Sequence, residues 1–286
     1  MKKLILLIAA IAAIAVLWPD NDTKPPAKAP PAGGQKPPAS GQSTAKPVKK
    51  EAPEPKKDEE VRTKPPAKES AAALKPDALP ITGTATAAKV VAVTFDHSWG
   101  NKFTPSILDT LKQNQLKVTF FIMGPWAANY PEVVKRIVAD GHEIASHGYR
   151  HENYGEKTAE WIKEDLTKSA AQIKEASGVT PKLFRPPNGH YSPQSLKLTS
   201  ELGYKTILWN IDSIDWMNPG RDVIIDRIMK RLQPGAIVLL HASDTPQQTA
   251  EALPILLAKI KAEGYKVVTV SELLTKYSEK GIIRDE

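Results

Sequence analysis

Five segments of this sequence place a charged or titratable side chain directly after a short run of apolar residues. The side chains are those of Asp96 and His97, His147, Arg185, Asp212 and His241. Carboxylates, imidazoles and a guanidinium are groups that bind metal ions, transfer protons and orient one another in active sites. Packing alone does not account for such a group at the end of each of five apolar runs. The pattern therefore predicts an active site.

Residues 147–151 (His-Gly-Tyr-Arg-His) place two imidazoles four positions apart. If this segment turns helically, both rings lie on one face and can share a metal ion. His97, from another strand end, is the candidate for a third ligand. Three protein ligands with an open position are typical of a catalytic zinc, which activates water and polarises a carbonyl. We therefore predict a divalent metal, zinc first and cobalt as an alternative, bound by His97, His147 and His151.

A hydrolase of this kind also needs a base for the water and an acid for the leaving group. Asp96 and His241 are the candidates, and a carboxylate base with a histidine acid suits amide cleavage, because the departing amine must be protonated. Asp212 is placed to keep His241 charged by pairing with it. Arg185 is placed to orient Asp96 through a bidentate bond.

The elements that position these groups alternate along the chain from Lys89 onward. We predict strands at residues 90–95, 118–122, 143–146, 182–185, 204–209, 236–240 and 266–270. We predict helices at residues 105–114, 131–140, 158–177, 192–202, 223–231, 252–263 and 272–277. This alternation indicates right-handed crossovers and a parallel sheet, and its seven or so repeats favour a barrel. In such folds the site lies at the C-terminal ends of the strands, where these side chains fall.

Five motifs occur in the order of a known family. They are residues 94–99 (Thr-Phe-Asp-His-Ser-Trp), 147–151, 185–189 (Arg-Pro-Pro-Asn-Gly), 212–216 (Asp-Ser-Ile-Asp-Trp) and 239–241 (Leu-Leu-His). Over about residues 88–277 the chain resembles polysaccharide deacetylases of the NodB-homology type, carbohydrate esterase family 4. It is similar to the sporulation-type peptidoglycan deacetylases of spore-forming bacteria.

The resemblance implies an α/β fold, a distorted (β/α)7 barrel, that removes N- or O-acetyl groups from sugar polymers. It implies Asp96 as general base, His241 as general acid, and His147 and His151 as metal ligands. Arg185 would orient the base and Asp212 would tune the acid. Leu239 would line the acetate pocket, and the backbone N–H of Asn188 would help to hold the oxyanion.

The sequence departs from the family at three places. His97 stands where the family has a metal-binding aspartate, Gly148 replaces a Ser or Thr, and Ser98-Trp99 replaces Gly-Pro. His97 either binds the metal, or points away and leaves a two-histidine site, or marks a domain that kept glycan binding and lost catalysis. The retained acid and base, with their partners Arg185 and Asp212, favour activity.

Two further groups of residues have less specific interpretations. Trp99 and Trp216 follow strands on the active face and are candidates to stack on sugar rings. The charged residues of 158–174 are interpreted as a solvated helix face.

The N-terminal part has a different composition. Residues 1–18 are a signal peptide or signal anchor, because a basic start precedes 15 apolar residues. Residues 19–80 hold 14 of the 25 prolines and indicate a disordered Pro/Lys/Ala-rich linker. Residues 81–286 form the catalytic domain, which we expect to be monomeric. Of the net charge of +7, residues 1–80 carry +5, so the basic excess is no argument for nucleic-acid binding by the domain. The absence of cysteine excludes disulfides and thiolate chemistry.

We therefore predict an exported protein, secreted to the cell wall or anchored at the outer face of the membrane through an uncleaved N-terminal segment. Its predicted activity is removal of N-acetyl groups from peptidoglycan or a chitin-like polymer, with a sporulation role. The alternatives are an O-acetyl esterase acting on xylan and a glycan-binding domain without turnover.

Overall fold

The computed structural model describes residues 74–285. The predicted signal segment and all but the end of the predicted linker lie outside these residues. Within them, no helix combines the length and apolar character needed to cross a membrane. The strands are β1 (Ile81–Thr84), β2 (Val90–His97), β3 (Thr119–Ile122), β4 (Glu143–Ser146), β5 (Leu183–Phe184), β6 (Lys205–Thr206), β7 (Ile211–Asp212), β8 (Ala236–His241), β9 (Lys266–Val268) and β10 (Ile282–Arg284). The helices are α1 (Thr104–Gln113), α2 (Gly124–Asn129), α3 (Pro131–Ala139), α4 (Ala159–Ser177), α5 (Pro193–Glu201), α6 (Arg221–Arg231), α7 (Thr249–Ala262) and α8 (Val270–Lys276).

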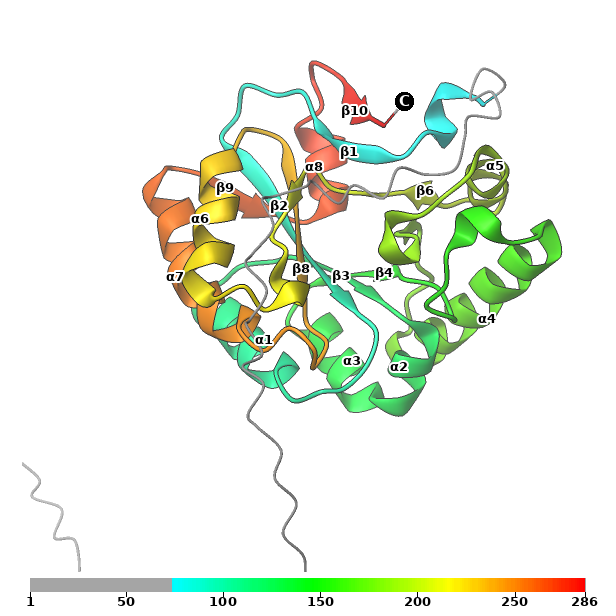
Figure 1. Cartoon of the computed structure of the whole chain (residues 1–286), viewed down its shortest axis with the longest axis horizontal. Coiled ribbons are helices and arrows are strands. Elements are labelled where there is room, and N and C mark those ends of the chain that lie inside the picture. Colours follow the sequence, from blue (N-terminus) through cyan, green and yellow to red (C-terminus); the bar gives the residue numbers. More distant parts are fainter. Residues whose placement is uncertain (1–73, 286) are drawn as a thin grey trace, which may run out of the picture. The chain divides into compact units, whose positions relative to one another are not determined.

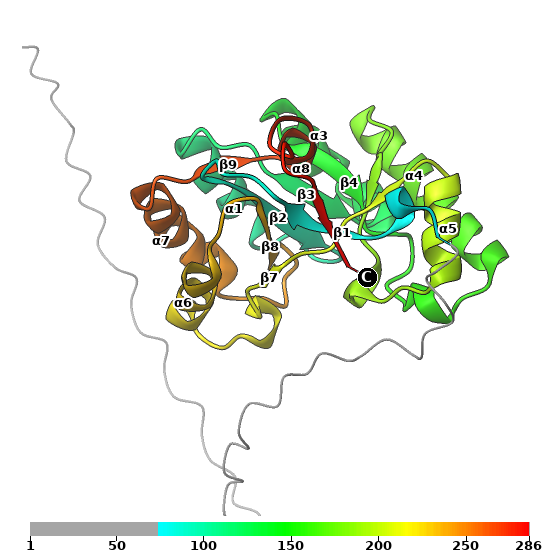
Figure 2. The same ribbon diagram turned by 90° about the horizontal axis from the view of Figure 1, so that it is seen from above.

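The strands form one curled sheet in the order β10-β1-β8-β2-β3-β4-β5-β6, with β7 beside β8 and β9 beside β2. All pairings from β2 to β9 are parallel, as predicted, whereas β1 pairs antiparallel with both β10 and β8. A single parallel bridge between Ile81 and Ile207 links β1 to the segment after β6, at the other end of the sheet. The curled sheet with its surrounding helices fits the predicted distorted barrel (Figures 1 and 2).

Strand β2 is the centre of this sheet and is buried along its whole length. Successive side chains of a strand point to opposite faces. Val93 and Phe95 accordingly join the large core between sheet and helices, while Ala92 belongs to a separate cluster on the other face. This alternation decides where the polar residues at the end of the strand point.

Helices α1, α2, α3, α6 and α7 (Figure 1) pack through buried apolar residues on the face of the sheet that carries Val93 and Phe95, whereas α8 packs on the other face. In α1 the buried residues Ile107, Leu108 and Leu111 recur at helical spacing. The long helix α4 begins where the Thr158 side chain accepts a hydrogen bond from Trp161 N, and it ends at left-handed Gly178, as the sequence predicts.

The sequence prediction differs from the structure mainly on the side of the sheet that carries β5 and β6. Residues 182–185 and 204–209 were expected as full strands, but β5 and β6 are two residues long. The carbonyls of Ile207 and Leu208 bind the buried guanidinium of Arg185, which takes them out of the strand ladder. The sequence does not predict the short elements β1, β7, β10 and α2.

Candidate active site

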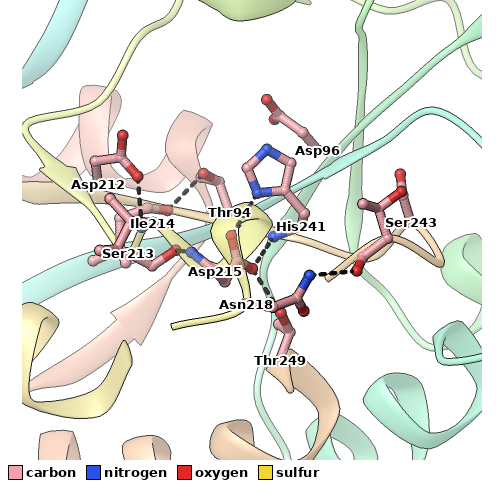
Figure 3. A network of polar contacts seen from close by, with 12 residues as sticks. Thr94, Asp96, Asp212, Ser213, Ile214, Asp215, Asn218, His241, Ser243 and Thr249 are labelled. Atoms are coloured by element: carbon pink, nitrogen blue, oxygen red, sulfur yellow. Dashed lines mark hydrogen bonds and ion pairs between the residues drawn. The ribbon is translucent and has the colours of Figure 1, made fainter. Parts of the chain in front are cut away.

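The predicted base and acid lie side by side. Asp96 is the last but one residue of strand β2 and His241 is the last residue of the parallel strand β8, and the two are register partners in that pair. Figure 3 shows the two side chains next to each other on the same side of the strands. The structure thus brings these two residues together at the C-terminal ends of parallel strands, where the active sites of such folds lie.

Asp96 is held by the buried side chain of Arg185. The guanidinium Nη1 donates to Asp96 Oδ1 at 2.6 Å and to Thr94 Oγ1 at 2.9 Å. Its Nη2 donates to the carbonyl of Leu208 at 3.0 Å. The bond to Asp96 is thus single, and the predicted bidentate bond is wrong because Leu208 occupies the second nitrogen.

The charges around Asp96 favour its ionised form. Burial acts to raise the pKa of this carboxyl, but Arg185, His147 and His241 act in the opposite direction. The net result is a pKa below the ordinary value. Asp96 is therefore a carboxylate at neutral pH and can accept a proton.

His241 is paired with Asp215. Its Nδ1 lies 2.6 Å from Asp215 Oδ1, and its backbone N–H donates to Asp215 Oδ2 at 2.8 Å. The Thr249 hydroxyl donates to the same Oδ2 at 2.7 Å, and the carboxylate is fully buried (Figure 3). Because a carboxylate only accepts, Nδ1 carries the proton, and Nε2 is left to act on a substrate.

The predicted partner of His241, Asp212, is therefore corrected to Asp215. Asp212 Oδ1 instead accepts the backbone N–H of Ile214 at 2.8 Å and caps the turn that follows β7. Ile214 has a left-handed backbone (φ 54°), and this turn brings Asp215 back under His241. Burial lowers the pKa of His241, but Asp215 foremost, then Asp96 and Asp212, raise it above the ordinary value.

The Asp215→Asn variant tests this pairing. Without the Asp215 charge, we expect the pKa of His241 to fall below that of the wild-type chain. His241 would then lose its proton at a lower pH, and the alkaline limb of the pH–rate profile would move to lower pH. NMR titration of the His241 ring measures the shift independently of activity. An unchanged His241 pKa would show that Asp215 does not control the acid.

His147 and His151 come together as predicted. Their ring centroids are 5.4 Å apart. His147 Nδ1 lies 2.9 Å from the carbonyl of Arg185, and because a carbonyl only accepts, Nδ1 carries the proton. Nε2 of the neutral ring is therefore unprotonated, and it lies 3.7 Å from Asp96 Oδ2. Burial lowers the pKa of His147 to about 4, so its ring is neutral at physiological pH. The segment is a loop rather than a helical turn, and Gly148 within it is left-handed (φ 82°).

Asp165 of α4 holds this loop in place. Its carboxylate accepts the backbone N–H of Tyr149 at 2.7 Å, that of Arg150 at 3.0 Å, and the hydroxyl of Tyr154. Asp165 is fully buried, so the interpretation of residues 158–174 as a wholly solvated face is wrong at this position. Its spacing from the buried Ile162 is the signal that places it on the inner face.

Ser169, one helical turn beyond Asp165, supports the same loop. Its hydroxyl donates to the carbonyl of Gly148 at 2.9 Å, while Gly148 N donates to Ser146 Oγ at 3.2 Å. A Cβ at position 148 would lie 2.7 Å from the Tyr154 hydroxyl, which explains glycine there. These serines brace the loop in place of the Ser or Thr that Gly148 replaces.

We expect Ser169→Ala to lower the free energy of unfolding by about 1 kcal/mol, because the buried Gly148 carbonyl loses a donor. Thr167→Ala, on the exposed face of the same helix, is the matched control and is expected to change stability by less than about 0.5 kcal/mol. Urea denaturation of both variants measures the difference. Equal stability of the two would contradict the bracing role of Ser169.

His97 lies apart from the other site residues, and its prediction as a metal ligand is contradicted. Strand β2 continues through His97, so this ring points to the face opposite that of Asp96. There it is fully buried, its Nε2 is 2.7 Å from Thr104 Oγ1, and its centroid is 3.8 Å from that of Trp126. Burial lowers its pKa to about 3, so the ring is neutral. The structure therefore matches a His97 side chain that points away and leaves a two-histidine site.

The remaining donors do not complete a catalytic metal site. Within residues 74–285, no group of three His, Cys, Asp or Glu side chains is arranged to hold a metal ion. His147 and His151 provide two imidazoles, one ligand short of the three that a catalytic zinc takes from protein. We therefore assign no step of the chemistry to a metal ion.

The predicted substrate-binding residues come from three elements. Leu239 is buried on β8 and shares the face of His241, two residues further on. Asn188 is exposed in the turn after β5, has a left-handed backbone (φ 58°), and donates its side chain to Asn153 Oδ1 at 3.0 Å. Trp216 follows Asp215 in a 3-10 turn and is 51% exposed.

Comparison with known proteins identifies the class. Residues 83–207 match the polysaccharide deacetylase family. A peptidoglycan-N-acetylglucosamine deacetylase of Bacillus cereus is 37% identical over 189 residues, which cover 65% of this chain and 88% of that protein. The chain belongs to this family of hydrolases, the polysaccharide deacetylases of carbohydrate esterase family 4. The predicted family and enzyme class are thereby confirmed.

Two other relatives are similar to this chain. The uncharacterized protein YlxY of Bacillus subtilis is 37% identical over 185 residues, covering 65% of this chain and 57% of that protein. The chain thus spans less than two thirds of the length of YlxY. A solved structure of a family 4 pseudoenzyme from Bacillus anthracis has 35% identity and a TM-score of 0.67, covering 71% of this chain and 70% of that one. A mutant of that pseudoenzyme with restored enzymatic activity has 36% identity and the same TM-score, covering 71% of this chain and 73% of the mutant.

Proposed function

We propose that this chain removes N-acetyl groups from amino-sugar polymers of the cell wall, with peptidoglycan as the first candidate substrate. The observation that carries the proposal is the adjacency of Asp96 and His241, each with its own buried partner. Arg185 keeps Asp96 ionised, and Asp215 keeps His241 protonated. A base and an acid with opposite charge preferences, side by side, are what hydrolysis of an acetamide needs.

In the proposed reaction a water molecule attacks the acetyl carbon and Asp96 takes one of its protons. The C–N bond then breaks, and His241 donates a proton to the departing nitrogen. The products are acetic acid, which ionises to acetate, and the free amine of the sugar, and transfer of the proton from Asp96 to His241 restores both groups. Leu239, on the face of His241, would contact the acetyl methyl group, and the backbone N–H of Asn188 would donate to the oxyanion.

We further propose that the curled sheet is a distorted (β/α)7 barrel and that the domain acts outside the cell. The apolar residues 4–18 behind a basic start support export, and the Pro/Lys-rich residues 19–80 suit a spacer between membrane and wall. A peptidoglycan substrate agrees with that location. A role in sporulation rests only on the resemblance to deacetylases of spore-forming bacteria.

A second candidate function is glycan binding without turnover. The orientation of His97 favours it, because the site then has two imidazoles where three ligands are typical of catalytic zinc. The similarity to a pseudoenzyme supports the same candidate. The acid and base pairs favour the hydrolase, since binding alone requires neither.

Acetate release by the full-length chain tests both candidates. We expect release from N-acetylated chitooligosaccharide or peptidoglycan, measured with and without added Zn²⁺ or Co²⁺, and less from O-acetylated xylan. Binding of the glycan with no acetate released would identify the glycan-binding function. Faster release from xylan than from the amino-sugar polymers would favour the esterase alternative.

A further inference from the structure

An exposed tryptophan stands beside the site on the loop after β2. Trp99 is 48% exposed, although large aromatic side chains usually bury most of their surface. Its ring meets that of His151 edge to face, with centroids 5.4 Å apart. Trp99 therefore adjoins the His147–His151 pair on the solvent side.

The orientation of Trp99 is fixed at its polar end. The indole Nε1 donates to Thr245 Oγ1 at 2.9 Å, and the Trp99 carbonyl accepts Asp244 N at 3.2 Å. The next residue, left-handed Gly100, accepts Trp126 Nε1 at 2.7 Å through its carbonyl. Since the indole N–H of Trp99 already donates to Thr245, the exposed part of the side chain offers a ring face for apolar contact and no hydrogen bond.

The segment that anchors Trp99 also connects to Trp216 and its neighbour Met217. Asn218 donates to the Thr245 carbonyl at 3.0 Å, and Gln247 N donates to Asn218 Oδ1 at 2.8 Å. Trp216 and Met217, which precede Asn218, are 51% and 60% exposed. The edge of the site thus carries exposed aromatic and apolar side chains on two loops that are tied together through Thr245.

We propose that Trp99 is a specificity-determining residue that stacks on a pyranose ring of the polymer. The ring is the sugar next to the one whose acetamide lies between Asp96 and His241. A pyranose presents C–H groups on its faces, and a rigid indole covers them with little loss of conformational entropy. The inference rests on the proposed function, because it takes the same glycan as ligand.

The test is isothermal titration of the full-length chain with N-acetylglucosamine oligomers of one to four units. We expect Trp99→Ala to weaken tetramer binding about tenfold, which corresponds to about 1.4 kcal/mol. Trp99→Phe keeps an aromatic face and is expected to bind within about threefold of wild type. Binding of the single sugar should be unchanged, because it does not reach Trp99. In turnover, Trp99→Ala should raise KM and leave kcat nearly unchanged.

Two further variants control for loss of structure. Thr245→Val removes only the hydrogen bond to the indole N–H, and its loss of tetramer affinity should lie between the losses of the two Trp99 variants. Ile255→Ala trims an exposed apolar side chain on α7 and should bind as wild type does. Tetramer binding by Trp99→Ala at wild-type strength would overturn the inference and leave the proposed function standing. If the wild-type chain bound no oligomer at all, the inference about Trp99 and the proposed function would both be overturned.

Discussion

The Asp96→Asn variant is expected to lose about 10²- to 10⁴-fold in kcat, the range that a positioned general base contributes. An amide has nearly the shape of the carboxylate but cannot take the proton of the attacking water. KM should change little, because the substrate contacts proposed for Leu239, Asn188 and Trp99 remain. The rate of acetate release at saturating substrate measures the loss.

The same substitution leaves the Arg185 guanidinium buried without an anionic partner. Removing one member of a buried ion pair typically costs about 3–5 kcal/mol. Bonds from Arg185 to Thr94 and to the carbonyls of Ile207 and Leu208 remain. The variant must therefore be assayed at a temperature below the midpoint of its own thermal unfolding, which circular dichroism measures.

Asp226→Asn is the matched control for a lost carboxylate. Asp226 lies on α6 in an exposed pair with Lys230, and its removal should leave both kcat and stability unchanged. If folded Asp96→Asn kept more than about a tenth of the wild-type kcat, another group would have to be the base. The proposed mechanism would then be wrong.

The predicted site residues that the structure brings together are those whose position follows from the strand ends alone. Asp96 and His241 lie at the C-terminal ends of long, buried strands rich in β-branched residues, and the parallel pairing of β2 with β8 makes them neighbours. Arg185 follows a strand of only two residues, yet it reaches Asp96 because its side chain is long.

The choice between Asp212 and Asp215 could not be made from spacing. Both carboxylates lie in one short motif, and either would suit a histidine partner. The choice depends on Ile214, a β-branched residue in the left-handed region, which sequence preference argues against. Such a conformation is imposed by the surrounding structure and is not predictable from local sequence.

The error at His97 has a different cause. A strand was expected to end at Phe95, which would leave Asp96 and His97 free to point together into the site. The structure extends β2 by two residues, so that consecutive side chains must diverge. The boundary of one strand thus determined whether the site has two histidines or three.

The His97→Ala variant should therefore leave Zn²⁺ affinity at the wild-type level and lower the free energy of unfolding by about 2–4 kcal/mol, as expected for a large-to-small change in a core. The ring fills a fully buried space against Trp126 and binds the Thr104 hydroxyl. Calorimetric Zn²⁺ titration and urea denaturation measure the two effects. His147→Ala is the comparison that should lose Zn²⁺ binding.

His97→Asp extends this prediction, because a carboxylate in that apolar space is unpaired and costs several kcal/mol. Residue 97 is expected to leave strand β2, so that the Asp side chain can turn toward His147 and His151, where it would supply a third ligand. At a Zn²⁺ concentration of 100 times the Kd of His97→Asp, the metal should stabilise this variant by about 2.7 kcal/mol, and should raise its unfolding temperature more than that of the wild type. His97→Asn, equal in size but uncharged, should show no such gain. If His97→Ala instead lost Zn²⁺ affinity as His147→Ala does, His97 would be a ligand in solution, and the outward orientation of its ring would not describe the working site.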